Sequence, residues 1–193
     1  MKTVKEEGIF ELIINKSRFI GIICNAENED EIDLKIKRIK QLYKDATHYC
    51  YAYITRYKEK CCDDGEPSGT GGIPILNVLK KNELTDVLCV VVRYFGGIKL
   101  GSGGLIRAYS SSASGALEKC TTGTLEKGYL VTIEFNYENM KNIDYILKNC
   151  EIIKKFEDVI TYTFKIPLND YETINEIQKY CEIVKKEEIL IIV

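Results

Sequence analysis

The chain has 193 residues, of which 45% are hydrophobic and 29% are charged, and its formal net charge is −2. These proportions are typical of a folded protein and exclude a disordered one, and the length suffices for one large domain or two small ones. A net charge so close to zero excludes nonspecific electrostatic binding of nucleic acid by the whole surface, so any contact with RNA must be local.

No apolar run approaches the roughly 20 residues that cross a bilayer, and the first residues show no secretory signal. We therefore expect a cytoplasmic protein with no membrane partner. The eight cysteines are scattered without a Cys-x-x-Cys pair, which favours reduced thiols in core positions. A zinc site from His48, Cys50, Cys61 and Cys62 would have poor tetrahedral spacing, so we expect no metal and no cofactor.

Apolar runs at residues 9–14 and 19–24 flank the polar residues 15–18, which predicts a β-hairpin. Apolar residues three to four apart over residues 29–44 predict an amphipathic helix. Strand-like alternation follows over residues 48–55. The three tyrosines of that strand could stack bases or could simply be packed, since alternate positions share one face: Tyr49, Tyr51 and Tyr53.

A long turn-rich loop is predicted from Lys58 to Thr70, and Thr70 is expected to cap a short helix that ends near Lys81. An apolar strand over residues 87–93, a glycine loop and a helix over about residues 103–119 come next.

The pattern changes after the polar stretch at residues 121–124, where we expect a domain boundary. We therefore predict an α+β protein with two domains, residues 1–124 and 125–193. The second domain has the order βαββαβ, which is the ferredoxin-like motif with both helices on one face of a four-stranded antiparallel sheet. Its expected elements are strand 129–135, helix 138–148, strands 151–157 and 159–166, helix 169–181 and strand 187–193.

The most informative segment is residues 93–109, where five glycines follow an apolar strand and precede a helix. That order places backbone N–H groups at a helix N-terminus, which suits an anion. Close packing of the glycines on a sheet is an equally good explanation. The spacing matches neither the dinucleotide-binding nor the Walker pattern. The candidate ligand- or phosphate-binding residues are Arg93, Gly96, Gly97, Lys99, Gly101, Gly103, Gly104 and Arg107.

The same segment concentrates positive charge in a mildly acidic chain. No acidic residue lies between Val87 and Leu117. Residues 1–125 hold 18 Lys and Arg against 16 Asp and Glu, whereas residues 126–193 hold 9 against 13. A phosphate bound here would gain backbone N–H bonds and guanidinium contacts together.

The loop before the short helix carries a cluster of carboxylates that could hold Mg²⁺ or, with His48, serve a modest hydrolase. A simpler explanation is a turn in which Ser68 or Thr70 caps the helix. No nucleophile elbow and no His-Glu-x-x-His helix is present, so we assign no catalytic residue. The candidates for a metal-binding or structural role are His48, Asp63, Asp64, Glu66, Ser68 and Thr70.

A third arrangement connects the two segments without any ligand. Arg93 or Arg107 would pair with one of the carboxylates at positions 63, 64 and 66 and lock the two loops together. Sequence alone leaves this arrangement and the phosphate site as equal alternatives.

The two segments together resemble the IMPACT/YigZ family. The resemblance rests on Asp-Asp-Gly-Glu-Pro-Ser-Gly-Thr at residues 63–70, on Arg-Tyr-Phe-Gly-Gly-Ile-Lys-Leu-Gly-Ser-Gly-Gly-Leu-Ile-Arg-Ala-Tyr at residues 93–109, and on His48-x-Cys50-Tyr51-Ala52. Gly71 departs from the family, which more often has alanine there. The resemblance is to bacterial two-domain members. It implies a first domain similar to ribosomal protein S5 domain 2 and a second similar to the ferredoxin-like C-terminal domain of elongation factor G.

Eukaryotic members of the family bind a ribosome-associated activator and restrain a kinase that senses amino-acid starvation. The resemblance therefore implies a link to translation. We expect a non-catalytic, translation-associated regulatory protein that contacts RNA, the ribosome or a translation factor, without DNA specificity. The alternatives are a metal-dependent phosphoester hydrolase and a protein-only regulatory partner that docks through the acidic second domain.

Overall fold

The computed structural model describes residues 1–193, apart from the side chain of Tyr171. The chain is an α+β protein that divides into two compact units, Met1–Thr124 and Leu125–Val193. None of the helices within the described residues has the length and apolar character needed to cross a bilayer. The elements of the first unit are β1 (Lys2–Glu6), β2 (Gly8–Ile14), β3 (Ser17–Asn25), α1 (Glu29–Leu42), β4 (His48–Ile54), β5 (Glu59–Cys62), α2 (Gly72–Lys81), β6 (Val87–Tyr94), α3 (Gly101–Lys119) and the start of β7 (Thr121–Phe135).

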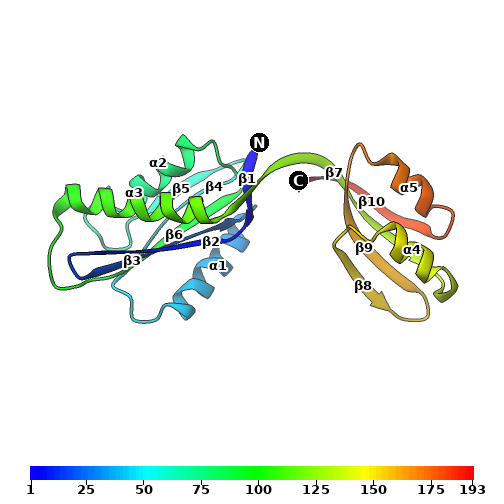
Figure 1. Ribbon diagram of the computed structural model, residues 1–193, viewed down its shortest axis with the longest axis horizontal. Helices are drawn as coiled ribbons and strands as arrows, with labels where there is room; N and C mark the ends of the chain where they lie inside the picture. The colour runs from blue at the N-terminus through cyan, green and yellow to red at the C-terminus, as the bar shows by residue number, and fades with distance from the viewer. The chain divides into compact units, whose positions relative to one another are not determined.

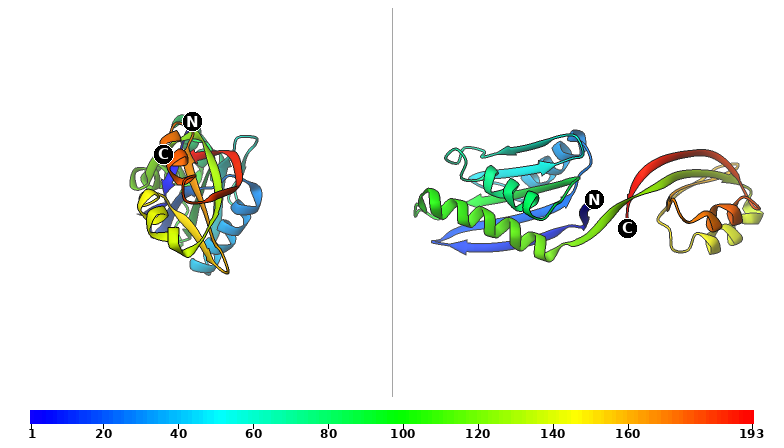
Figure 2. Two further views of the ribbon diagram at one scale, coloured as in Figure 1. Left: turned by 90° about the vertical axis from the view of Figure 1, so that its right-hand side faces the viewer. Right: turned by 90° about the horizontal axis from the view of Figure 1, so that it is seen from above.

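Five strands of the first unit form an antiparallel sheet in the order β2-β3-β6-β4-β5 (Figure 1). Helix α1 covers one face, and α2 and α3 cover the other (Figure 2). The central strand β6 is therefore buried on both sides, which explains why residues 87–92 are continuously apolar rather than alternating. The register places His48 of β4 and Phe19 of β3 opposite Arg93 at the end of β6.

The strand tyrosines lie on the face that α1 covers, where they pack into the core. Tyr49 donates a hydrogen bond from its hydroxyl to the carbonyl oxygen of Tyr43, at 2.6 Å. Tyr53 donates to Oε1 of Glu29, at 2.7 Å. Of the two explanations for these tyrosines, packing therefore describes them and base stacking does not.

The second unit contains a four-stranded antiparallel sheet in the order β8-β9-β7-β10. Both helices contribute to a single core with β7 and β9, through Ile143 of α4 and Ile174 of α5. The predicted order βαββαβ is confirmed. The elements are the remainder of β7, a 3-10 helix (Tyr137–Asn139), α4 (Met140–Ile146), β8 (Ile152–Phe156), β9 (Ile160–Pro167), α5 (Tyr171–Ile177) and β10 (Glu182–Ile192).

The structure adds detail to the expected elements at two places and corrects them at one. The stretch at residues 121–124, where a domain boundary is expected, is the beginning of the long strand β7 and pairs with β1. The first part of the predicted Lys58–Thr70 loop is strand β5, which pairs with β4. β1 itself has no apolar pattern to reveal it, since its strand structure depends on a partner more than 110 residues away.

Candidate functional site

The acidic loop begins with Asp63, whose carboxylate accepts three hydrogen bonds from backbone N–H groups. Oδ1 accepts hydrogen bonds from the N–H groups of Gly71 and Gly72, at 2.9 and 2.8 Å, and Oδ2 accepts one from Gly69, at 2.8 Å. Burial raises the pKa of Asp63, but these three donors outweigh it and hold the pKa below its usual range. Asp63 therefore fixes the first turn of α2.

The predicted capping of α2 by Thr70 is wrong. The helix has no side-chain cap at its N-cap residue, Gly71. The Thr70 hydroxyl donates instead to the carbonyl oxygen of Pro67, at 2.6 Å, and Ser68 is exposed. The position is unsuitable for a cap because the Asp63 carboxylate already satisfies the first N–H groups of the helix.

Asp64 ties the acidic loop to β4. Its carboxylate accepts a hydrogen bond from the N–H of Tyr49, at 2.7 Å, and its carbonyl oxygen accepts one from Nδ1 of His48, at 2.8 Å. Lys40 of α1 lies 3.9 Å from the other carboxylate oxygen. The backbone of Asp64 has a φ of 43°, a left-handed conformation that Asp adopts more readily than most residues.

Glu66 and Arg93 form an ion pair that is buried within the first unit. Oε1 of Glu66 lies 2.5 Å from an Nη atom of Arg93 and accepts a hydrogen bond from the Tyr109 hydroxyl, at 2.7 Å. The side chains of Glu66 and Arg93 are only 3% and 5% exposed. The guanidinium carbon lies 5.2 Å from the ring centre of Phe19 and 5.3 Å from that of Phe95. This is the arrangement in which an arginine locks the two loops together.

His48 and Cys50 border this buried cluster. Nε2 of His48 lies 4.0 Å from Oε2 of Glu66. Cys50 donates a hydrogen bond to the carbonyl oxygen of Asp63, at 2.9 Å, and burial raises the pKa of its thiol to about 12. Burial first, and then Cys50 and Glu66, also raise the pKa of Tyr109, so its hydroxyl stays a donor. The cluster therefore contains no activated nucleophile among the described residues.

The loop between β6 and α3 is anchored at its start by two side chains. The N–H of Phe95 donates to Oγ1 of Thr47, at 2.9 Å, and the N–H of Gly96 donates to Oγ of Ser17, at 3.1 Å. A Cβ on Gly96 would lie 2.0 Å from the carbonyl carbon of Lys16, so only glycine fits there.

The structural reason for glycine differs among the remaining glycines of the segment. Gly97 and Gly101 have φ of 84° and 71° and face open space, so backbone conformation rather than packing accounts for them. A Cβ on Gly104 would lie 3.0 Å from Cβ of Leu100. Gly103 lies in the helical first turn of α3, and a Cβ there would meet nothing nearer than Nη1 of Arg107, at 3.9 Å. Neither a left-handed backbone conformation nor close packing accounts for Gly103.

Lys99 and Arg107 are exposed, and neither makes an ion pair within the part of the chain that the structure describes. The first turn of α3 has no side-chain cap and no acidic residue. The structure thus divides the candidate residues into two sets. Arg93 is buried and committed to Glu66, whereas Lys99 and Arg107 lie beside the exposed N-terminus of α3, where phosphate binding stays a prediction.

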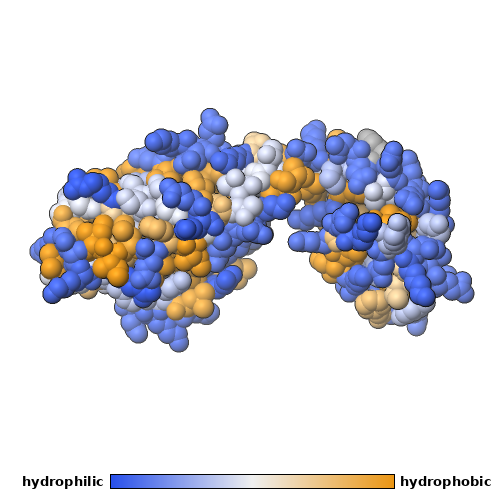
Figure 3. All heavy atoms as spheres, in the orientation of Figure 1, coloured by the Kyte–Doolittle hydropathy of each residue, from blue (hydrophilic) through white to orange (hydrophobic). Residues whose placement is uncertain are grey.

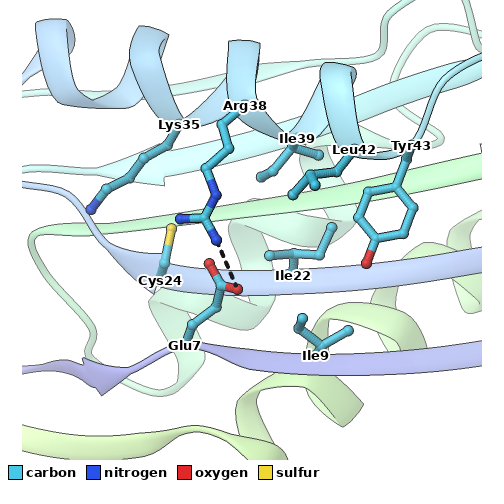
Figure 4. A pocket seen from close by; sticks show the side chains of 9 residues that line it. All are labelled: Glu7, Ile9, Ile22, Cys24, Lys35, Arg38, Ile39, Leu42 and Tyr43. Atoms are coloured by element: carbon cyan, nitrogen blue, oxygen red, sulfur yellow. Dashed lines mark ion pairs between the residues drawn. The ribbon is translucent and has the colours of Figure 1, made fainter.

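No group of three or more His, Cys, Asp and Glu side chains is arranged to hold a metal ion in the described residues. A separate groove lies between α1 and strands β2 and β3, where Glu7 and Arg38 approach to 4.0 Å (Figure 4). Its cavity of about 30 Å³ has room for a water molecule or two. Burial raises the pKa of the Cys24 thiol in this groove to about 11, so the thiol is inert.

Residues critical to the cluster were missed by sequence reasoning. Tyr109, Phe19 and Phe95 are apolar in the pattern, and nothing local shows that they surround a buried arginine. Ser17 and Thr47, which anchor the loop, lie far from it in sequence. Only the position of Tyr109 at the end of the glycine-rich motif could have drawn attention to it.

The sequence and the fold are similar to those of several known proteins. Residues 15–117 match the Impact N-terminal domain. The chain is 52% identical over 118 residues to the IMPACT family member YvyE of Bacillus subtilis (strain 168), covering 60% of this chain and only 54% of that relative. It is 32% identical over 143 residues to the IMPACT family member YigZ of Escherichia coli (strain K12), covering 72% and 70%. The crystal structure of a hypothetical protein aligns with a TM-score of 0.63 at 25% identity, covering 100% of this chain and 96% of that one.

Replacing Glu66 by Gln is expected to lower the free energy of unfolding by about 3–5 kcal/mol, because the charge of Arg93 stays buried without its partner. Glu59→Gln is the matched control, since Glu59 pairs with Lys80 at 2.6 Å on the surface. That change should cost less than about 1 kcal/mol. Urea unfolding of the two variants measures the difference, and equal losses would contradict a buried clamp.

Asp63 gives a pH dependence with a definite sign. Its pKa is depressed in the folded state, so its contribution to stability is complete above the unfolded pKa of about 3.9 and is lost as the pH falls through the folded pKa. Asp63→Asn lacks this titration. Urea unfolding between about pH 6 and pH 2 should therefore show a steeper acid loss in the wild type than in the variant. Parallel curves would show that the three backbone donors do not favour the ionised carboxylate.

Proposed function

Because the chain belongs to the IMPACT family, as its match over residues 15–117 shows, we propose that it is a non-catalytic, translation-associated regulatory protein that contacts RNA. The link to translation follows the role of the family that the resemblance implies. The contact is made by the exposed loop between β6 and α3 and by the first turn of α3. The proposed site of action is the cytoplasm, on the ribosome or on a translation factor that carries RNA.

The observation that carries this proposal is the uncapped N-terminus of α3 between two unpaired cations. The first N–H groups of a helix have no partner within the helix, and they bear partial positive charge. Lys99 precedes them and Arg107 follows them on the exposed side of the helix. Gly103 leaves this surface without a side chain, although alanine would favour a helix interior by about 1 kcal/mol. A phosphate group close to the backbone fits all three features.

The buried clamp supports the exposed loop rather than forming a second site. Arg93 joins the end of β6 to Glu66, and Asp63 fixes the loop that contains Glu66 to the start of α2. The carboxylates of the proposed hydrolase are thus occupied by an arginine and by backbone donors. This favours a binding protein over the metal-dependent hydrolase among the functions considered.

The fold assignments that the resemblance implies are part of the proposal. The strand order β10-β7-β9-β8 in the second unit supports a ferredoxin-like domain similar to the C-terminal domain of elongation factor G. The first unit is proposed to be similar to ribosomal protein S5 domain 2. Both similarities agree with a protein that acts in translation, although fold by itself does not establish function.

Replacing Lys99 and Arg107 together by Gln is expected to weaken co-sedimentation with ribosomes by about 1–3 kcal/mol and to reduce the salt dependence, because fewer counterions are released. The melting temperature should not change, since neither side chain has an ion-pair partner in the described residues. Lys119→Gln, at the other end of α3, is the matched control.

Three other outcomes would contradict the proposal in different ways. Binding that is insensitive to salt and persists on a protein without RNA would favour the protein-only partner. Unchanged binding by the double variant would remove this loop as the contact. A fall in melting temperature without weaker binding would make the two cations structural.

A further inference from the structure

We infer that the RNA bound at this surface is single-stranded and that Phe95 is the platform on which an unpaired base stacks. The inference rests on the proposed function for the existence of an RNA contact. It adds the class of RNA and the residue that recognises it.

Phe95 is exposed and yet rigidly supported. The residue follows the last position of β6, and 45% of it is exposed to solvent. Its N–H is held by Thr47, and the guanidinium of Arg93 lies 5.3 Å from the centre of its ring. Arg93 is itself fixed by Glu66 and Phe19. An aromatic ring that is held in this way on a buried cation loses little freedom when a base stacks on its exposed side.

Four cations that make no ion pair lie in segments that contact the end of β6 or follow it in the chain. The hairpin turn between β2 and β3 lies close to the β6–α3 loop, because Gly96 packs against the backbone of Lys16. The loop after α1 is joined to the end of β6 by the hydroxyl of Tyr94, which donates to the carbonyl oxygen of Lys44, at 3.1 Å. Within the described residues, none of the four makes an ion pair: Lys16, Lys44, Lys99 and Arg107.

The other exposed side chains of these loops include apolar residues and a single carboxylate. Ile98 and Ile106 are 44% and 41% exposed, and Asp45 is the one carboxylate in these loops. Figure 3 shows apolar surface at the end of the first unit where this loop lies. An exposed aromatic ring in a loop with nearby cations matches a polyanion whose bases are accessible, because the phosphates contact the cations and a base stacks on the ring.

This pattern favours a single strand over a duplex. The bases of a duplex are stacked on each other, so Phe95 has no base face to contact there. A duplex would meet only the cations, which do not distinguish the two forms. The sequence-derived candidates for stacking are excluded from this role because they pack against α1. Phe95 is therefore the aromatic residue that gives the surface a preference for unpaired bases.

The test measures fluorescence anisotropy of labelled oligouridylate of about 12 nucleotides and of an RNA duplex of the same length. Phe95→Leu is expected to weaken binding of the single strand about tenfold and to leave duplex binding unchanged, whereas Phe95→Tyr keeps the ring and binds both probes like the wild type. Tyr57→Leu is the matched control and binds both probes like the wild type. Tyr57 is an exposed aromatic over Arg56, at the opposite end of β4.

Each contrary outcome identifies what fails. If Phe95→Leu binds the single strand like the wild type while the Lys99 and Arg107 double variant loses both probes, the inference is overturned and the proposed function stands. Equal weakening of single strand and duplex by Phe95→Leu, or a Phe95→Tyr variant as weak as Phe95→Leu, also overturns it. Binding of neither probe by the wild-type protein overturns the RNA contact itself. Phe95→Tyr keeps the test decisive if Phe95→Leu melts early.

Discussion

The buried ion pair between Glu66 and Arg93 is the interaction on which both loops of the candidate site depend. Both charged side chains are almost fully buried, so each requires the other, and the Tyr109 hydroxyl from α3 donates a further hydrogen bond to Glu66. The pair joins the acidic loop to the end of the central strand β6. From that strand end the chain enters the exposed loop that carries Phe95 and the glycines. A rigid interior therefore supports a surface whose side chains are free.

This division explains how the acidic motif and the glycine-rich basic motif come to have different roles. The carboxylates of the acidic loop are directed inward, where Asp63 fixes α2 and Glu66 holds Arg93. The cations of the glycine-rich segment are exposed, except for Arg93, which lies near the end of β6 and is buried. The proposed binding is therefore assigned to the basic motif, whereas the acidic motif stabilises the fold.

The sequence predicted the parts of the fold whose pattern is local. The hairpin, the amphipathic helix α1 and the βαββαβ order followed from periodicity and turn residues. Strands β1 and β5 and the continuous course of β7 did not, because their pairing partners lie far away in sequence or in a loop. At the site, the arginine–carboxylate alternative was foreseen, but the choice of Arg93 and Glu66 was not. That choice depends on the register of β4, β3 and β6 and on which side chains helix α3 brings to the end of the sheet.

The central claim is that RNA contacts the backbone and cations of the β6–α3 loop while the acidic loop stays structural. Hydrogen exchange of the backbone amides, with and without RNA, measures this most directly. We expect slower exchange over residues 97–104 in the presence of RNA. No change is expected at Gly69, Gly71 and Gly72, whose amides already donate to Asp63. Unchanged exchange over residues 97–104, or protection confined to the acidic loop, would contradict the claim.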